Sequence, residues 1–102
     1  MNSSDLLTSI EAGRPPAILD VRSNWEFDRG RVPGAIHIPF WTLLGRLSEI
    51  SAYRETPMVV YCELGPRAWM AGTALKLCGF RGVQYLDGHM AHWRRHRLPQ
   101  EK

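Results

Sequence analysis

Long hydrophobic runs are absent from this sequence. No apolar stretch approaches the roughly 20 residues that a membrane-spanning helix requires, and the N-terminal MNSSDLLTS lacks the basic start and apolar core of a signal peptide. Low-complexity tracts, repeats and linkers are missing as well, while 44% of the residues are hydrophobic and 23% are charged. We therefore expect a soluble, cytoplasmic protein with no membrane partner, and a single globular domain over residues 1–102.

Cysteine is scarce. Cys62 and Cys78 are too few for a disulfide framework, and their settings differ too much to support a pair. Free thiols are typical of a reducing compartment. Cys78 ends an apolar helical stripe, which predicts a role in core packing and sets it apart from Cys62.

A strong charge of either sign is also missing. The 13 Lys and Arg residues outnumber the 10 Asp and Glu residues for a net charge of +3, and the excess collects in WRRHR at 93–97. So short a patch can attract small anions or an acidic partner, whereas a nucleic-acid surface normally carries a longer basic stripe with exposed aromatic residues. We therefore expect no nucleic-acid partner.

Metal ligands are sparse. His89, His92 and His96 would share one face of a helix and could bind zinc or nickel. No fourth ligand accompanies them, so we expect a solvated polar face, and neither a metal nor another cofactor.

Strand and helix patterns alternate along the chain. The strand patterns are AILDV, AIHI, MVVYC and GVQYL, at 17–21, 35–38, 58–62 and 82–86. Helical patterns begin after Ser3 or Ser4, after Ser23, at Pro66 and near Met90, and an amphipathic stripe is formed by Leu43, Leu44, Leu47 and Ile50. Alternation with short connections predicts an α/β fold, in which helices cover both faces of a mainly parallel sheet.

Cys62 stands at the carboxyl end of the strongest strand pattern, and ligands of open α/β sheets bind beyond the carboxyl ends of the strands. The segment CELGPR at 62–67 then leads into a helix N-terminus, where free backbone N–H groups and the helix dipole favour both an anion and a thiolate. Gly65 can adopt a positive φ that lets successive N–H groups converge, and Arg67 adds a planar cation that fits an oxyanion.

A purely structural interpretation is also open, with Cys62 as a small buried residue and Arg67 as an exposed one. However, a cation in the first turn of a helix opposes the helix dipole, so Arg67 requires a compensating anion. An anionic thiolate and an anionic substrate would supply it. We therefore favour a functional cysteine.

Five segments carry a family resemblance: LDVR at 19–22, EF at 26–27, VPGAIHIP at 32–39, VVYCELGPRA at 59–68 and YLDGHMAHW at 85–93. In this order and spacing they closely resemble the rhodanese homology domain, over nearly the whole chain. The resemblance implies a single-domain, rhodanese-like α/β fold with a four- or five-stranded, mainly parallel sheet, in agreement with the patterns above.

The resemblance also implies a thiosulfate sulfurtransferase activity. Cys62 would take a sulfane sulfur from thiosulfate or a persulfide donor, hold it as a persulfide, and pass it to a thiol or to cyanide, with thioredoxin or glutathione as candidate acceptors. The substrate-binding loop would consist of Glu63, Leu64, Gly65 and Pro66, with Arg67 closing it.

Alternatives come from within the same fold. A noncatalytic regulatory binding module, or a sulfur carrier loaded by another protein, would use its surface rather than its pocket. Phosphatases that resemble the family place five residues between cysteine and arginine, whereas four residues separate Cys62 from Arg67, which disfavours a phosphoryl group. We therefore rank the sulfurtransferase first and a phosphatase-like anion-binding enzyme last.

Several further residues have open roles. Asp20 and Arg22 match the early family motif and would either position the site or form a structural ion pair, in which Arg22 could contact Glu26. Glu63 could turn outward, where solvent screens its charge, or inward, where it would repel thiosulfate and favour a thiol or protein persulfide as donor.

Two family glycines are replaced here, by His89 and by Arg97. His89 could narrow the pocket or assist deprotonation of the thiol, but we expect it to point into solvent. His37 is expected to be a structural strand residue, whereas Trp41 and Trp69 could wall the pocket or present a docking patch.

Overall fold

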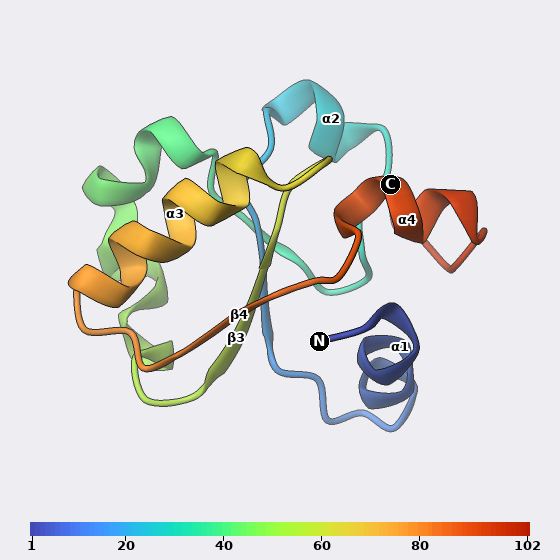
Figure 1. The fold of residues 1–102 in the computed structure, drawn as a ribbon, viewed down its shortest axis with the longest axis horizontal. Coiled ribbons are helices and arrows are strands. Elements are labelled where there is room, and N and C mark those ends of the chain that lie inside the picture. The colour runs from blue at the N-terminus through green and yellow to red at the C-terminus, as the bar shows by residue number, and fades with distance from the viewer.

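The computed structural model describes residues 1–102 and has an α/β architecture, as the sequence predicted. Figure 1 shows α1 (Ser3–Glu11), β1 (Ala17–Asp20), α2 (Asn24–Asp28), β2 (Ile36–His37), the 3-10 helix η1 (Phe40–Tyr53), β3 (Pro57–Tyr61), α3 (Pro66–Leu77), β4 (Gly82–Tyr85) and α4 (His89–Arg95). The four strands form one sheet in the order β2-β1-β3-β4, and all neighbouring pairs are parallel.

The sheet separates two hydrophobic cores, because β1 and β3 are apolar on both faces. On one face, Leu19 and Val60 pack with residues of η1 and α3. On the other face, Ile18 and Val59 pack with residues of α1 and α4. Figure 1 shows the corresponding layers, with α3 on one side of the strands and α1 and α4 on the other. None of the helices combines the length and apolar character that crossing a membrane requires.

Helix caps explain where the short helices begin. The prediction that Ser3 or Ser4 caps α1 is wrong, because the cap is Asn2, whose side chain accepts a hydrogen bond from the backbone N–H of Asp5 at 2.7 Å. The predicted cap of α2 is confirmed. Ser23 and Glu26 form a reciprocal capping box that satisfies backbone donors of both residues.

The predicted amphipathic helix of residues 43–50 is wrong in type. Residues 40–53 form a 3-10 helix with a kink at Arg46, where φ is −125°. Leu43 and Ile50 are buried as expected, but Leu44 is 67% exposed. A 3-10 helix has three residues per turn, so the apolar spacing of an α-helix no longer falls on one face.

Proline and glycine delimit α3, the helix that follows Cys62. Pro66 occupies its first turn, and Gly79, with φ at +92°, follows its end. Cys78 caps the helix and packs against the core, as predicted. Trp93 anchors α4 in the opposite core, and its indole N–H donates to the carbonyl oxygen of Pro99 at 2.7 Å.

Candidate functional site

Cys62 lies where β3 ends and the loop to α3 begins. Figure 1 shows α2 beside this loop, at the carboxyl ends of the strands. The cysteine lines a cavity of about 280 Å³ together with Glu26, Glu63, Leu64, Pro66 and Arg67. The structure therefore gathers most of the predicted loop residues around one small cavity.

The loop directs a backbone donor at the sulfur atom. The backbone N–H of Gly65 donates to Cys62 Sγ at 3.0 Å, which is a short contact for a sulfur acceptor. Gly65 has φ at +132°, a conformation that side chains disfavour, so glycine is required for this contact. The N-terminus of α3 follows directly, and its dipole adds positive potential near the sulfur. This environment can stabilise a thiolate or a bound sulfur atom.

Arg67 is held by a carboxylate that the sequence did not place in the site. Its guanidinium donates to the two carboxylate oxygens of Glu26, at 2.6 and 2.9 Å. The hydrogen bonds from Arg67, followed by those from Ser23, lower the pKa of Glu26 to about 2, and the same pair raises the pKa of Arg67. An incoming anion must therefore share Arg67 with Glu26 or displace the Glu26 carboxylate from Arg67. The EF segment and the capping box were the available sequence signals for Glu26.

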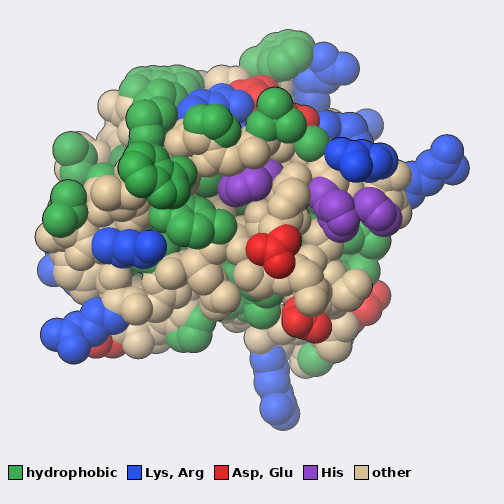
Figure 2. Space-filling view, in the orientation of Figure 1, with side chains coloured by type: hydrophobic (Ala, Val, Ile, Leu, Met, Phe, Trp, Pro, Cys, Tyr) green, Lys and Arg blue, Asp and Glu red, His purple; other side chains and the backbone are tan.

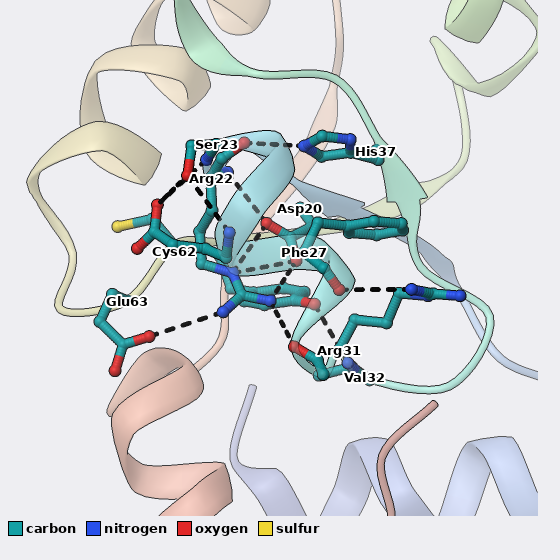
Figure 3. A network of polar contacts seen from close by, with 12 residues as sticks. Asp20, Arg22, Ser23, Phe27, Arg31, Val32, His37, Cys62 and Glu63 are labelled. Carbon is teal, nitrogen blue, oxygen red and sulfur yellow. Dashed lines mark hydrogen bonds and ion pairs between the residues drawn. The ribbon is translucent and has the colours of Figure 1, made fainter. Parts of the chain in front are cut away.

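Asp20 and Arg22 form a buried ion pair beneath the loop (Figure 3). Arg22 donates to both carboxylate oxygens of Asp20 and to the carbonyl oxygen of Gly30. Burial opposes the charge of Arg22, but its bonds to Asp20 outweigh this effect and raise its pKa. The predicted contact with Glu26 is wrong, since Glu26 pairs with Arg67 instead.

Glu63 follows neither predicted orientation fully, because its carboxylate turns away from the sulfur of Cys62 (Figure 3) but is only 28% exposed and pairs with arginines instead of lying free in solvent. Its carboxylate accepts hydrogen bonds of 2.7 to 2.9 Å from Arg94 of α4 and lies 3.6 Å from the guanidinium of Arg22. Figure 3 shows Arg22 between Asp20 and Glu63, while the sulfur of Cys62 points away from the Arg22 guanidinium. The negative charge of Glu63 is therefore neutralised and does not oppose an anion at the sulfur.

His89 lies against the loop, and the expectation that it points into solvent is wrong. Its Nδ1 accepts the backbone N–H of Cys62 at 3.3 Å, and Nε2 lies 3.2 Å from the position that a Cβ on Gly65 would occupy. Burial lowers the pKa of His89, so the acceptor form is favoured. The cause of this placement is the backbone, because His89 has φ at +54° directly after Gly88 in the left-handed region.

The three histidines in and directly after α4 do not converge. His92 and His96 stack at 4.0 Å between ring centroids, and Nδ1 of His92 hydrogen-bonds Ser3 Oγ, whereas His89 faces the loop. His37 also lies apart from the sulfur, stacked on Phe27 and donating through Nε2 to the carbonyl oxygen of Arg22 (Figure 3). Its predicted structural role fits these contacts.

The exposed tryptophans do not wall the cysteine cavity. Trp41 is 60% exposed and Trp69 is 64% exposed, and neither lines this cavity. The pocket-wall interpretation is therefore wrong for both, and their exposed rings keep the docking interpretation open. Trp25, which is 65% exposed, lines a second and larger cavity next to the first.

Comparisons with known proteins agree with the fold. The protein-family model of the rhodanese-like domain matches residues 3–96 of this chain. A sulfurtransferase of Allochromatium vinosum is 34% identical over 82 residues, which cover 80% of this chain and 75% of that protein. Human single-domain sulfurtransferase TSTD1 superposes with a TM-score of 0.81 at 25% identity, over 93% of this chain and 94% of that one.

A further relative is much longer than this chain. An HTH-type transcriptional regulator of Mycobacterium tuberculosis is 37% identical over 101 residues, which cover 97% of this chain but only 43% of the regulator. The relatives of this sequence thus include sulfurtransferases and a transcriptional regulator.

Proposed function

Because the chain belongs to the rhodanese-like domain family, we propose that it is a sulfurtransferase that carries a sulfane sulfur on Cys62. One observation carries the proposal. Cys62 Sγ accepts a hydrogen bond from the Gly65 N–H at 3.0 Å, at the base of a loop that opens α3. This donor and the helix dipole stabilise negative charge on the sulfur of Cys62. Sulfur transfer requires this charge, because Cys62 must attack the donor as a thiolate and leave the persulfide as a thiolate.

The transfer proceeds in two displacements. The Cys62 thiolate attacks the outer sulfur of thiosulfate, the sulfur–sulfur bond breaks, and sulfite leaves with the bonding electron pair. The resulting persulfide is then attacked at its terminal sulfur by a thiolate, such as that of thioredoxin or glutathione, or by cyanide. The Cys62 thiolate leaves, and the cysteine is ready for another cycle.

The surrounding charges suit this sequence of steps. Arg67 can stabilise the sulfonate end of thiosulfate once it is released in part from Glu26. Glu63 offers no opposing charge because Arg94 and Arg22 neutralise it. The buried pair of Asp20 and Arg22 supports the loop from below without contacting the sulfur.

A second candidate function is a sulfur carrier that another protein loads. The ion pair between Glu26 and Arg67 supports it, because the only arginine that lines the cysteine cavity is already satisfied by an internal carboxylate. A small anionic donor competes with this pair, whereas a protein persulfide does not need the arginine. The two functions therefore differ in whether thiosulfate alone loads Cys62.

Intact mass after incubation with thiosulfate tests the proposal, in nonreducing conditions and with a later thiol-release step. The matched variants are Cys62→Ser and Cys78→Ser, which remove one thiol each. We expect a gain of one sulfur atom that thiol reverses, in the wild type and in Cys78→Ser but not in Cys62→Ser. If the mass does not increase with thiosulfate but does increase with a protein persulfide, the sulfur-carrier function would be favoured over the thiosulfate sulfurtransferase. A gain that persists in Cys62→Ser would refute both.

A further inference from the structure

A second cavity, of about 790 Å³, adjoins the cysteine cavity, because Glu26 and Glu63 line both. We call it the cationic cavity. The other residues that line it are Arg22, Trp25, Arg29, Gly30, Arg94, Arg97, Leu98, Gln100 and Lys102. Its volume is within the range of small-molecule sites, roughly 300–1,000 Å³, and far exceeds the needs of thiosulfate.

The wall formed by residues 98–102 is held in place by specific contacts. Arg31 and Glu101 exchange two backbone hydrogen bonds of 2.9 Å, and a carboxylate oxygen of Glu101 accepts the backbone N–H of Gly34 at 2.8 Å. The indole N–H of Trp93 donates to Pro99, as described above. The cavity is therefore a built feature of the fold rather than a gap beside a free tail.

The lining carries five cationic and two anionic side chains. Both carboxylates are engaged, Glu26 by Arg67 and Glu63 by Arg94 and Arg22. Arg29 and Arg97 have no carboxylate within 4.0 Å. In Figure 2, Lys and Arg side chains gather along the upper right of the molecule, around the C-terminal end of the chain. The cavity therefore presents uncompensated positive charge.

One further feature points to an organic ligand rather than to simple ions. Trp25 offers an exposed ring, and the guanidinium of Arg29 lies 4.7 Å from its centroid, so an aromatic surface and a cation are presented together. Arg97 also lines the cavity, and its φ of +54° is accounted for by the end of α4, where the backbone N–H groups of Arg97 and Leu98 donate to the carbonyl oxygens of Arg94 and Trp93.

We propose that the cationic cavity binds the anionic groups of a small-molecule thiol or persulfide that carries at least two negative charges, with its sulfur directed into the cysteine cavity. This inference rests on the proposed function, since it names the donor or acceptor of Cys62. With a persulfide donor, the Cys62 thiolate attacks the outer sulfur, the sulfur–sulfur bond breaks, and the donor leaves as its thiolate. With a thiol acceptor the same step runs in reverse.

The anionic groups can be carboxylates, as in glutathione, or phosphates, as in coenzyme A, because arginine binds either one with paired hydrogen bonds. Thioether analogues separate these sources without any sulfur transfer. We would measure binding of S-methylglutathione, S-methyl-coenzyme A and the neutral N-acetyl-S-methylcysteamine to the full chain by calorimetry, at low and at high salt.

The variants are Arg97→Gly, which also relieves the positive φ, and Arg29→Gln, with Arg14→Gln as a control for the loss of one charge at an exposed residue outside the cavity. We expect at least one anionic thioether to bind at least about tenfold more tightly than the neutral one. Arg97→Gly and Arg29→Gln should each weaken its binding by about three- to tenfold, and Arg14→Gln should not. High salt should reduce the binding as well.

Tighter binding of one anionic thioether than of the other shows whether the cavity prefers carboxylates or phosphates. Equal binding of all three compounds, or equal effects of the Arg14 and Arg97 substitutions, would overturn the proposal. Binding of an acidic peptide in place of both anionic thioethers would also overturn it, in favour of a protein partner. None of these results requires Cys62 to accept sulfur, so the cationic cavity and the sulfurtransferase can fail independently.

Discussion

Glu26→Gln is the most informative single substitution, because Glu26 completes the capping box of α2 and also forms an ion pair with Arg67. Glutamine keeps the capping geometry but loses the charge, so the change isolates the ion pair. The pKa of Glu26 falls from 4.5 to about 2 in the folded protein. That displacement corresponds to about 3 kcal/mol at neutral pH. Solvent reaches the 18% exposed carboxylate, so we expect a loss of about 1–2 kcal/mol in the free energy of unfolding.

The pH dependence follows from the direction of the shift. A carboxylate with a lowered pKa stabilises the fold above the unfolded pKa and loses this contribution as the pH falls toward the folded pKa. Between pH 7 and pH 3.5 the contribution of Glu26 should therefore shrink by about two fifths. Urea unfolding monitored by tryptophan fluorescence at both pH values measures this difference.

Glu49→Gln is the matched control, because Glu49 pairs with Arg46 at the surface and its substitution should leave the urea midpoint unchanged. Glu26→Gln should also release Arg67 and lower the KM for thiosulfate. An equal loss of stability at both pH values would refute the ion-pair account. An unchanged KM would show that Arg67 does not meet the donor.

Three further predictions test other parts of the structure. Tyr61→Phe removes the acceptor of a buried backbone N–H and should cost about 1–3 kcal/mol in urea unfolding. Tyr85→Phe should cost nothing, since the Tyr85 hydroxyl is buried without a partner, and equal losses for both would contradict this reasoning. Arg22→Met should cost about 3–5 kcal/mol by leaving Asp20 buried and unpaired, and adding Asp20→Asn should restore part of the loss. Without such recovery the damage would lie in packing. Because burial lowers the pKa of His89, folding weakens as the pH falls below 6.5. His89→Gln should lose less stability than the wild type between pH 7 and pH 5.5, and parallel losses would exclude His89 as the source.

The strands and the loop at Cys62 could be predicted from local sequence. The apolar run before Cys62 suits a strand covered on both faces, and Gly65 and Pro66 permit the turn and open the next helix. Ser23 was recognisable as a cap because capping involves residues only three positions apart. These features depend on neighbouring residues, which a single sequence displays.

The partners within the site could not be predicted in the same way. Glu26 and Arg67 are 41 positions apart, and Cys62 and His89 are 27 apart. Which carboxylate meets which arginine depends on how α2 and α4 approach the loop, so both the suggested contact of Arg22 with Glu26 and the solvent-facing His89 were wrong. The 3-10 geometry of η1 was missed for a related reason, because packing outweighed a weak helical pattern.

By itself, the sequence determined the α/β class, the place of Cys62 at a strand end and the loop that surrounds its sulfur, since periodicity, turn residues and helix capping act over a few residues. Only the tertiary structure decided that Glu26 forms an ion pair with Arg67, that His89 contacts the loop and that Arg29 and Arg97 line the same cavity. The physical reason is that ion pairs and cavities depend on distances between elements, which parallel strands and their crossover connections establish only when the chain is folded.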